Sequence, residues 1–146
     1  MATRSKIAIE DQDGTVRSIY CHWDGYPSHH GPILLEHYTT QEKVESLIAL
    51  GSISSLAPET EIPEGVTHNF ENATEGIVVA YHRDRGEALS IKAHGSVNDF
   101  VKSDVEEYGY VFTAAGEWLF ANGHVGAYDR EAVLLETVLV KEEDAE

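Results

Sequence analysis

The chain has 146 residues, 42% of them hydrophobic, and carries 26 acidic against 10 basic side chains, for a formal net charge of −16 at pH 7. This length is typical of one domain with its own core, and so negative a charge argues against nucleic acid or an anionic membrane as a partner. The single cysteine, Cys21, excludes an intramolecular disulfide, and no apolar run reaches membrane-spanning length, so we expect a soluble cytoplasmic protein.

The first predicted element is a β-hairpin. Residues 6–10 are mostly apolar, Asp13-Gly14 is a strong turn signal, and residues 15–23 alternate between two faces. The alternation places His22 on the face opposite Cys21.

Two short helices are predicted after the hairpin. Gly31-Pro32 opens the first, because proline suits the first turn of a helix. The second covers residues 41–50, with Thr39-Thr40 as its cap and Gly51 at its end. Both are expected to pack on the hairpin.

The middle of the chain is predicted as a long loop followed by a strand. Residues 52–72 contain two prolines and a glycine, a composition that predicts irregular structure. Residues 76–82 are nearly all apolar and predict a buried strand. Residues 83–87 form the turn after it, and residues 88–93 are compatible with a further strand.

The last third is predicted to hold a helix and a second hairpin. Ser96 is a helix cap for residues 97–102, and residues 107–112 and 117–121 form the hairpin. Residues 132–140 fit either a strand or a helix, and their β-branched valines favour a strand.

These elements predict an α+β fold with a mainly antiparallel sheet of five to six strands and two or three short helices packed on it. The expected organisation is a single domain over residues 1–141, followed by an acidic, frayed tail over residues 142–146.

The negative charge is concentrated in the first half of the chain. Between Ser18 and His82, Lys43 is the only lysine or arginine. The same stretch holds nine acids: Asp24, Glu36, Glu42, Glu45, Glu59, Glu61, Glu64, Glu71 and Glu75. Two interpretations stay open: the charge only keeps the protein soluble, or it forms a surface for a basic groove on another protein.

Histidines gather around the end of the first hairpin and raise the possibility of a metal site. The candidate ligands are His22, Asp24, His29, His30 and His37. No ligand template such as H-E-x-x-H is present, so ordinary strand and loop histidines are the simpler interpretation and no cofactor is expected.

Two further segments could bind a small molecule. Arg83 and Arg85 can present guanidinium forks to a carboxylate or phosphate, or simply pair with nearby acids. The Tyr20–Pro27 turn adds aromatic side chains, for which core packing is the simpler role. The candidate ligand-binding residues are His22, Trp23, Asp24, Tyr26, Arg83, Asp84 and Arg85. No nucleophile, P-loop or dinucleotide motif occurs, so no catalytic residue is predicted and an enzyme is not favoured.

The Tyr20–Pro27 segment (Y-C-H-W-D-G-Y-P) together with Arg83–Glu87 (R-D-R-G-E) resembles a group of small uncharacterised proteins of tailed bacteriophages. The resemblance covers roughly the first 90 residues. It implies a viral protein acting in the cytoplasm of the infected bacterial host, and it implies no particular activity.

Three hypotheses follow from the sequence. The first is a non-catalytic protein that binds a host protein through its acidic surface. The second is a binder of a nucleotide-like ligand, held between residues 20–27 and residues 83–87. The third, and weakest, is a metal-dependent enzyme built on the histidines.

Overall fold

The structure is a computed structural model that describes residues 2–144. Over these residues the fold is α+β, with five helices and eight strands. The strands are β1 (Ser5–Glu10), β2 (Val16–Cys21), β3 (Ile53–Ser55), β4 (Val79–Ala80), β5 (Lys92–His94), β6 (Tyr108–Phe112), β7 (Trp118–Asn122) and β8 (Val133–Leu134). The helices are α1 (Pro27–His37), α2 (Gln41–Ile48), α3 (Tyr81–Arg85), α4 (Val97–Ser103) and α5 (Leu135–Asp144).

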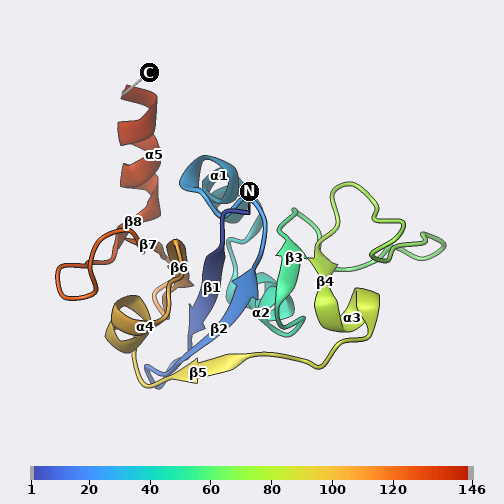
Figure 1. The fold of residues 1–146 in the computed structure, drawn as a ribbon, viewed down its shortest axis with the longest axis horizontal. Helices are drawn as coiled ribbons and strands as arrows, with labels where there is room; N and C mark the ends of the chain where they lie inside the picture. Colours follow the sequence, from blue (N-terminus) through green and yellow to red (C-terminus); the bar gives the residue numbers. More distant parts are fainter. Residues whose placement is uncertain (1, 145–146) are drawn as a thin grey trace.

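The sheet is mixed, so the prediction of a mainly antiparallel sheet with five to six strands was wrong. Its strand order is β4-β3-β2-β1-β6-β7-β8, with β5 pairing on β2 (Figure 1). The pairs β1–β6 and β2–β3 are parallel. Each parallel pair joins strands separated by at least one helix in the chain, and such long connections leave the strand direction free.

Both predicted hairpins are confirmed. β1 and β2 pair from Ser5 opposite Cys21 to Glu10 opposite Val16, and β6 pairs antiparallel with β7. The first turn closes through Gly14, which has a positive φ of 90° and donates its N–H to the carbonyl of Asp11. The glycine is suited to this backbone conformation because it lacks a Cβ.

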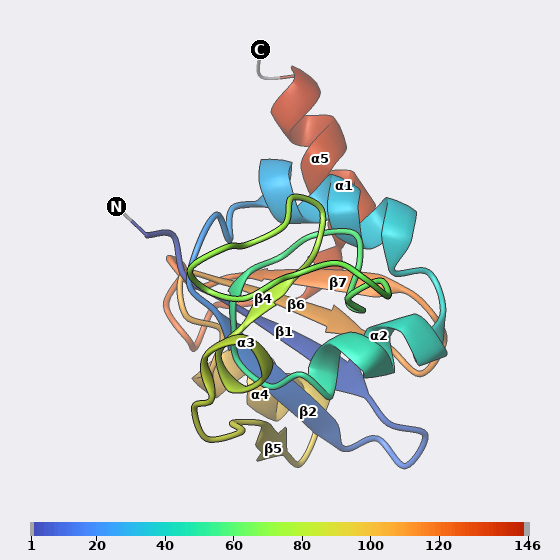
Figure 2. The same ribbon diagram turned by 90° about the vertical axis from the view of Figure 1, so that its right-hand side faces the viewer.

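The helices form layers on both faces of the sheet (Figure 2). On one face the buried side chains of α1 and α2 pack in a large cluster with Ile7 and Ile19. On the other face α4 buries Phe100 against the small residue Ala8 and Val16. The strands in the centre of the sheet are therefore covered from both sides.

The helix α2 confirms its prediction, since Thr40 accepts a hydrogen bond from the Lys43 backbone N–H at its start. The helix α1 begins at Pro27, four residues earlier than predicted. Pro27 occupies the first helical position, where its missing N–H costs nothing, and Pro32 lies inside the helix.

Two predictions for the middle of the chain were wrong in part. The predicted loop over residues 52–72 contains β3, which lies next to β2. The predicted strand over residues 76–82 is reduced to β4, and α3 replaces its end and the following turn. The Asp84 carboxylate accepts the Ala80 backbone N–H at the start of α3 and so satisfies a backbone donor that the helix itself leaves unpaired.

The strand predicted for residues 132–140 is also wrong for most of its length. β8 has two residues, and the helix α5 follows it. Leu135, Val138 and Leu139 have the spacing of one helical face, and a methyl group on Gly31 of α1 would lie 2.8 Å from the Leu139 side chain. The predicted acidic tail is helical as far as Asp144, and residues 145–146 lie outside the described residues.

Candidate functional site

The Tyr20–Pro27 turn has a backbone that is anchored in the fold. The Gly25 N–H donates to the Thr3 carbonyl at 2.9 Å, and the Tyr110 hydroxyl donates to the Gly25 carbonyl at 2.6 Å. A Cβ at Gly25 would lie 2.6 Å from the Ser5 Cβ, so only glycine fits this close approach. The start of β1 and the middle of β6 thus hold the turn in one place.

Between these anchors the turn presents two aromatic side chains to solvent. Trp23 is 44% exposed and Tyr26 is 38% exposed, whereas Gly25 and Pro27 are buried. Asp24 follows Trp23 in the sequence, is exposed and has a left-handed φ of 56°. Its carboxylate makes no hydrogen bond or ion pair within residues 2–144. The turn is a fixed backbone that carries exposed Trp, Asp and Tyr.

Ring contacts connect Trp23, through His22, to Tyr20 near the end of β2. The ring centroids of Tyr20 and His22 are 5.9 Å apart, and those of His22 and Trp23 are 4.8 Å apart. The Tyr20 hydroxyl lies 2.7 Å from His22 Nδ1. Burial raises the pKa of Tyr20 against the opposing effect of the Arg4 charge, so the phenol stays protonated near neutral pH.

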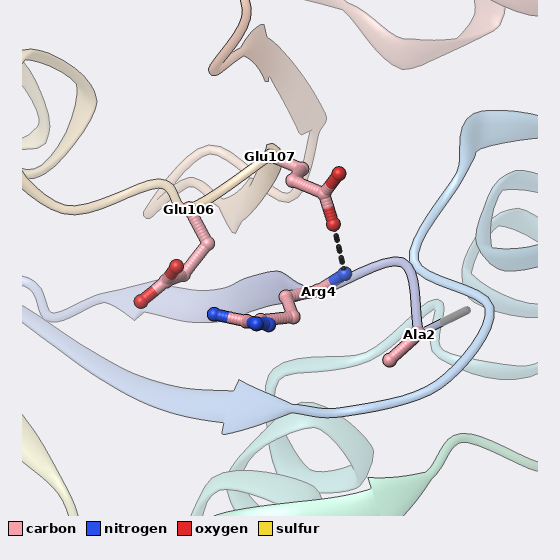
Figure 3. Close-up of a pocket in the computed structure, with 4 residues that line it drawn as sticks. All are labelled: Ala2, Arg4, Glu106 and Glu107. Carbon is pink, nitrogen blue, oxygen red and sulfur yellow. Dashed lines mark hydrogen bonds between the residues drawn. The ribbon is translucent and has the colours of Figure 1, made fainter.

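An open cavity of about 500 Å³ lies at the start of β1 and is lined by Ala2, Arg4, Glu106 and Glu107 (Figure 3). The Glu107 carboxylate accepts the Arg4 backbone N–H at 2.7 Å, while the Arg4 guanidinium and the Glu106 carboxylate make no ion pair with each other. Glu106 has a φ of 53°, an unusual backbone conformation for glutamate. Gly123 packs so closely on the Glu106 carbonyl that a Cβ there would clash with it.

The Arg83 guanidinium points into the protein and not toward a ligand. It donates to the carbonyls of Thr60 and Val78 and to the Asp84 carboxylate, which is almost fully buried. Burial tends to raise the pKa of Asp84, but hydrogen bonds from Arg83 and the Ala80 N–H keep it below its usual value. These contacts tie α3 to the loop that precedes β4.

His68 completes this network from the loop. The Thr74 backbone N–H donates to His68 Nδ1 at 2.9 Å, so in the neutral ring the proton is on Nε2. Nε2 lies 3.0 Å from the Val78 carbonyl and 3.3 Å from the Asp84 carboxylate. Arg83, Asp84 and His68 therefore form an internal polar network that organises an otherwise irregular segment.

Arg85 is exposed, but its guanidinium already contacts other side chains of the protein. Its guanidinium lies 4.4 Å from the centroid of the Phe70 ring and 5.1 Å from that of Tyr81, and it pairs with Glu87 at 2.5 Å. Within residues 2–144, no hydrogen bond, ion pair or ring contact joins residues 83–87 to residues 20–27. A ligand site shared by the two segments therefore stays a prediction.

The candidate metal ligands are also scattered. Over residues 2–144 no three His, Cys, Asp or Glu side chains form a group able to hold a metal. His29 and His30 lie together, with their Nδ1 atoms 3.0 Å apart, and the fully buried His30 contacts Ser5 Oγ through Nε2 at 3.2 Å. Burial, with a smaller effect of His29, lowers the pKa of His30 to about 3. His22 and Asp24 belong to the turn, and His37 is exposed at the end of α1.

One constellation has the residue types of a hydrolytic triad but not its geometry. Ser18 Oγ and the Asp104 carboxylate both approach His94 Nε2, at 2.9 and 3.6 Å. A relay needs the nucleophile and the carboxylate on opposite ring nitrogens. Ser18 is buried, and burial raises the pKa of the Cys21 thiol to about 12, so neither is an accessible nucleophile here.

Most acidic side chains in the first half of the chain are exposed to solvent. Of the nine between Ser18 and His82, all except Glu45 are exposed, and in the described part of the chain only Glu45 and Glu59 have ion pairs, with Arg17 and Lys43. We define the acidic surface as the exposed glutamates of α2 and the loop after β3. They are Glu42, Glu59, Glu61, Glu64, Glu71 and Glu75.

The acidic surface lies on one side of the molecule, where α2 and the loop face the viewer in Figure 2. An open cavity of about 410 Å³ joins them, and its charged lining residues are Glu42, Glu59, Glu61 and one cation, Lys43. The hydroxyls of Ser46 in α2 and Thr60 in the loop are 3.1 Å apart. The loop is thus fastened to the helix, and at this cavity glutamates from both segments lie together.

Lys43 pairs with Glu59 in this surface, whereas several other basic side chains are used inside the fold. Arg130 donates to the carbonyls of Val101, Gly123 and Val125. Lys102 donates to the carbonyls of Tyr128 and Arg130. Together with Arg83, these cations hold loops in place.

Comparisons with protein-family models, curated proteins and solved structures find no match to this chain. Over residues 2–144, no helix is both long and apolar enough to span a membrane.

Sequence reasoning missed the cavity at Arg4, Glu106 and Glu107. No local signal could have found it, because Arg4 and its partner Glu107 are 103 positions apart in the chain. No local signal marks Glu106, since its backbone conformation depends on the close approach of Gly123 from the strand region after β7.

Proposed function

We propose that this protein is a non-catalytic binding protein that engages a basic surface of a host protein, in the cytoplasm of an infected bacterium. The viral setting rests on the sequence resemblance of the two motifs. The binding mode rests on a single observation, the exposed and largely unpaired carboxylates of the acidic surface. Repulsion between like charges on the surface raises the free energy of the unbound protein, and a cationic partner reduces this repulsion when it docks.

Binding to the partner is expected to depend strongly on salt and on the acidic surface. The protein immobilised at 50 mM salt should capture a basic protein from a bacterial lysate and release it at 500 mM, because screening shortens the range of surface charges. With the captured protein purified, the triple variant E59Q/E61Q/E64Q should bind it about tenfold more weakly than the unmodified chain.

The matched control removes the same number of charges elsewhere. Glu117, Glu131 and Glu136 are exposed and lie outside the acidic surface. The E117Q/E131Q/E136Q variant should keep most of its affinity if local charge carries the interaction. Equal losses of affinity in the two variants would show that net charge, and not the acidic surface, determines binding. If no protein is captured at 50 mM salt, the proposed function is contradicted.

A further inference from the structure

We propose that Trp23 and Asp24 form an arginine-selective contact within the partner interface, so that the protein recognises arginine and not positive charge alone. This inference rests on the proposed function, and it names arginine as the side chain of the basic partner that the turn recognises. It gives the Tyr20–Pro27 turn a role that core packing does not explain.

The turn has the physical properties of an interaction hot spot. Tryptophan and tyrosine are enriched among the residues that dominate binding energy where proteins dock. Here the backbone beneath them is fixed by the hydrogen bonds of Gly25 to Thr3 and Tyr110, so little conformational entropy is lost when a partner binds.

The chemistry of the two residues fits a guanidinium group. An arginine can stack its planar guanidinium on the Trp23 indole and donate two hydrogen bonds to the adjacent Asp24 carboxylate. That carboxylate has no protein partner in the described part of the chain, so no existing interaction must be broken. A lysine ammonium lacks the planar fork, and its stronger hydration makes stacking less favourable.

The turn is also connected to the acidic surface. The backbone N–H groups of His22 and Trp23 donate to the carbonyls of Ile53 and Ser54 in β3. The chain leaving β3 then carries Glu59 and Glu61. These glutamates thus follow the strand to which the turn is hydrogen-bonded, and in the proposed interface Trp23 and Asp24 supply selectivity while the glutamates supply long-range attraction.

The test compares a peptide of ten arginines with a peptide of ten lysines at 50 mM salt. Affinity is measured by calorimetry, and contact by tryptophan emission, since Trp23 is exposed and the second tryptophan, Trp118, is buried. The arginine peptide should bind about fivefold more tightly and should quench the emission. Trp23→Ala should remove this preference and leave the affinity for the lysine peptide unchanged.

Two further variants complete the design. Asp24→Asn keeps a residue type that tolerates the left-handed backbone and should weaken the arginine peptide more than the lysine peptide. Tyr128→Ala removes an aromatic ring that is 94% exposed in the loop before β8, and should leave the preference intact.

The outcomes separate the two proposals. If both peptides bind equally well to the unmodified chain, or if the preference survives Trp23→Ala, the arginine contact is overturned while the acidic interface stands. If neither peptide binds at 50 mM salt, the proposed function fails and the contact fails with it.

Discussion

Replacing Asp84 with alanine is expected to lower the free energy of unfolding by about 3 kcal/mol, the cost of leaving a buried charged partner uncompensated. The Asp84 carboxylate is nearly fully buried and accepts hydrogen bonds from Arg83 and the Ala80 N–H, with His68 3.3 Å away. Its loss leaves the Ala80 N–H without its acceptor and the Arg83 guanidinium without its counter-charge, with only the Thr60 and Val78 carbonyls as acceptors. Denaturant unfolding of the variant and the unmodified chain measures the difference.

The matched control is Glu87→Ala, which removes the partner of Arg85 in an ion pair with both side chains about half exposed. Such surface pairs contribute roughly 0–1 kcal/mol, so this variant should be nearly as stable as the unmodified chain. Hydrogen exchange gives a second readout, because Asp84→Ala should expose the Ala80 amide while β1 amides stay protected. An Asp84→Ala variant within 1 kcal/mol of the unmodified chain would show that the network is not structural.

Acidification from pH 7 to pH 4.5 is expected to cost about 3 kcal/mol of stability through His30 alone. Burial lowers the pKa of this side chain to about 3 in the folded protein, against about 6.5 in an unfolded chain. Between these values the unfolded chain binds a proton that the folded protein does not. The stability is therefore complete above pH 6.5 and is lost as the pH falls toward 3.

The measurement is denaturant unfolding of the unmodified chain, His30→Gln and His37→Gln at both pH values. Protonation of the many carboxylates relieves repulsion and acts in the opposite direction, but it is common to all three proteins and cancels in the comparison. His94, whose pKa burial also lowers, leaves part of the acid sensitivity in His30→Gln. The exposed His37 serves as the control and should change nothing.

An independent readout does not depend on the variant folding. In the unmodified chain the ring resonances of His30 should not titrate between pH 5 and pH 8. A His30 ring that titrates near pH 6.5 would contradict the expectation.

The sequence by itself determined the elements whose signals are local. The two hairpins follow from strand alternation and turn residues such as Asp13-Gly14, and α2 and α4 follow from the caps Thr40 and Ser96. In each case the hydrogen-bond partners lie within one short, continuous segment of the chain, so the pattern that predicts the element also contains its partners.

Only the tertiary structure decided the features that depend on distant partners. The parallel pairing of β1 with β6 made the sheet mixed, and the contact of Leu139 with Gly31 accompanies α5 where a strand was expected. Burial among distant residues likewise keeps His30 uncharged.

The candidate site divides in the same way. The Tyr20–Pro27 turn stands out in the sequence, but the exposure of Trp23 and Asp24 depends on anchors at Thr3, just before β1, and at Tyr110 in β6. Arg83 and Arg85 stand out equally, and the fold directs one toward buried carbonyls and Asp84 and the other onto aromatic rings. A sequence pattern shows which side chains are unusual, whereas their direction depends on hydrogen-bond acceptors and packing surfaces supplied by remote segments.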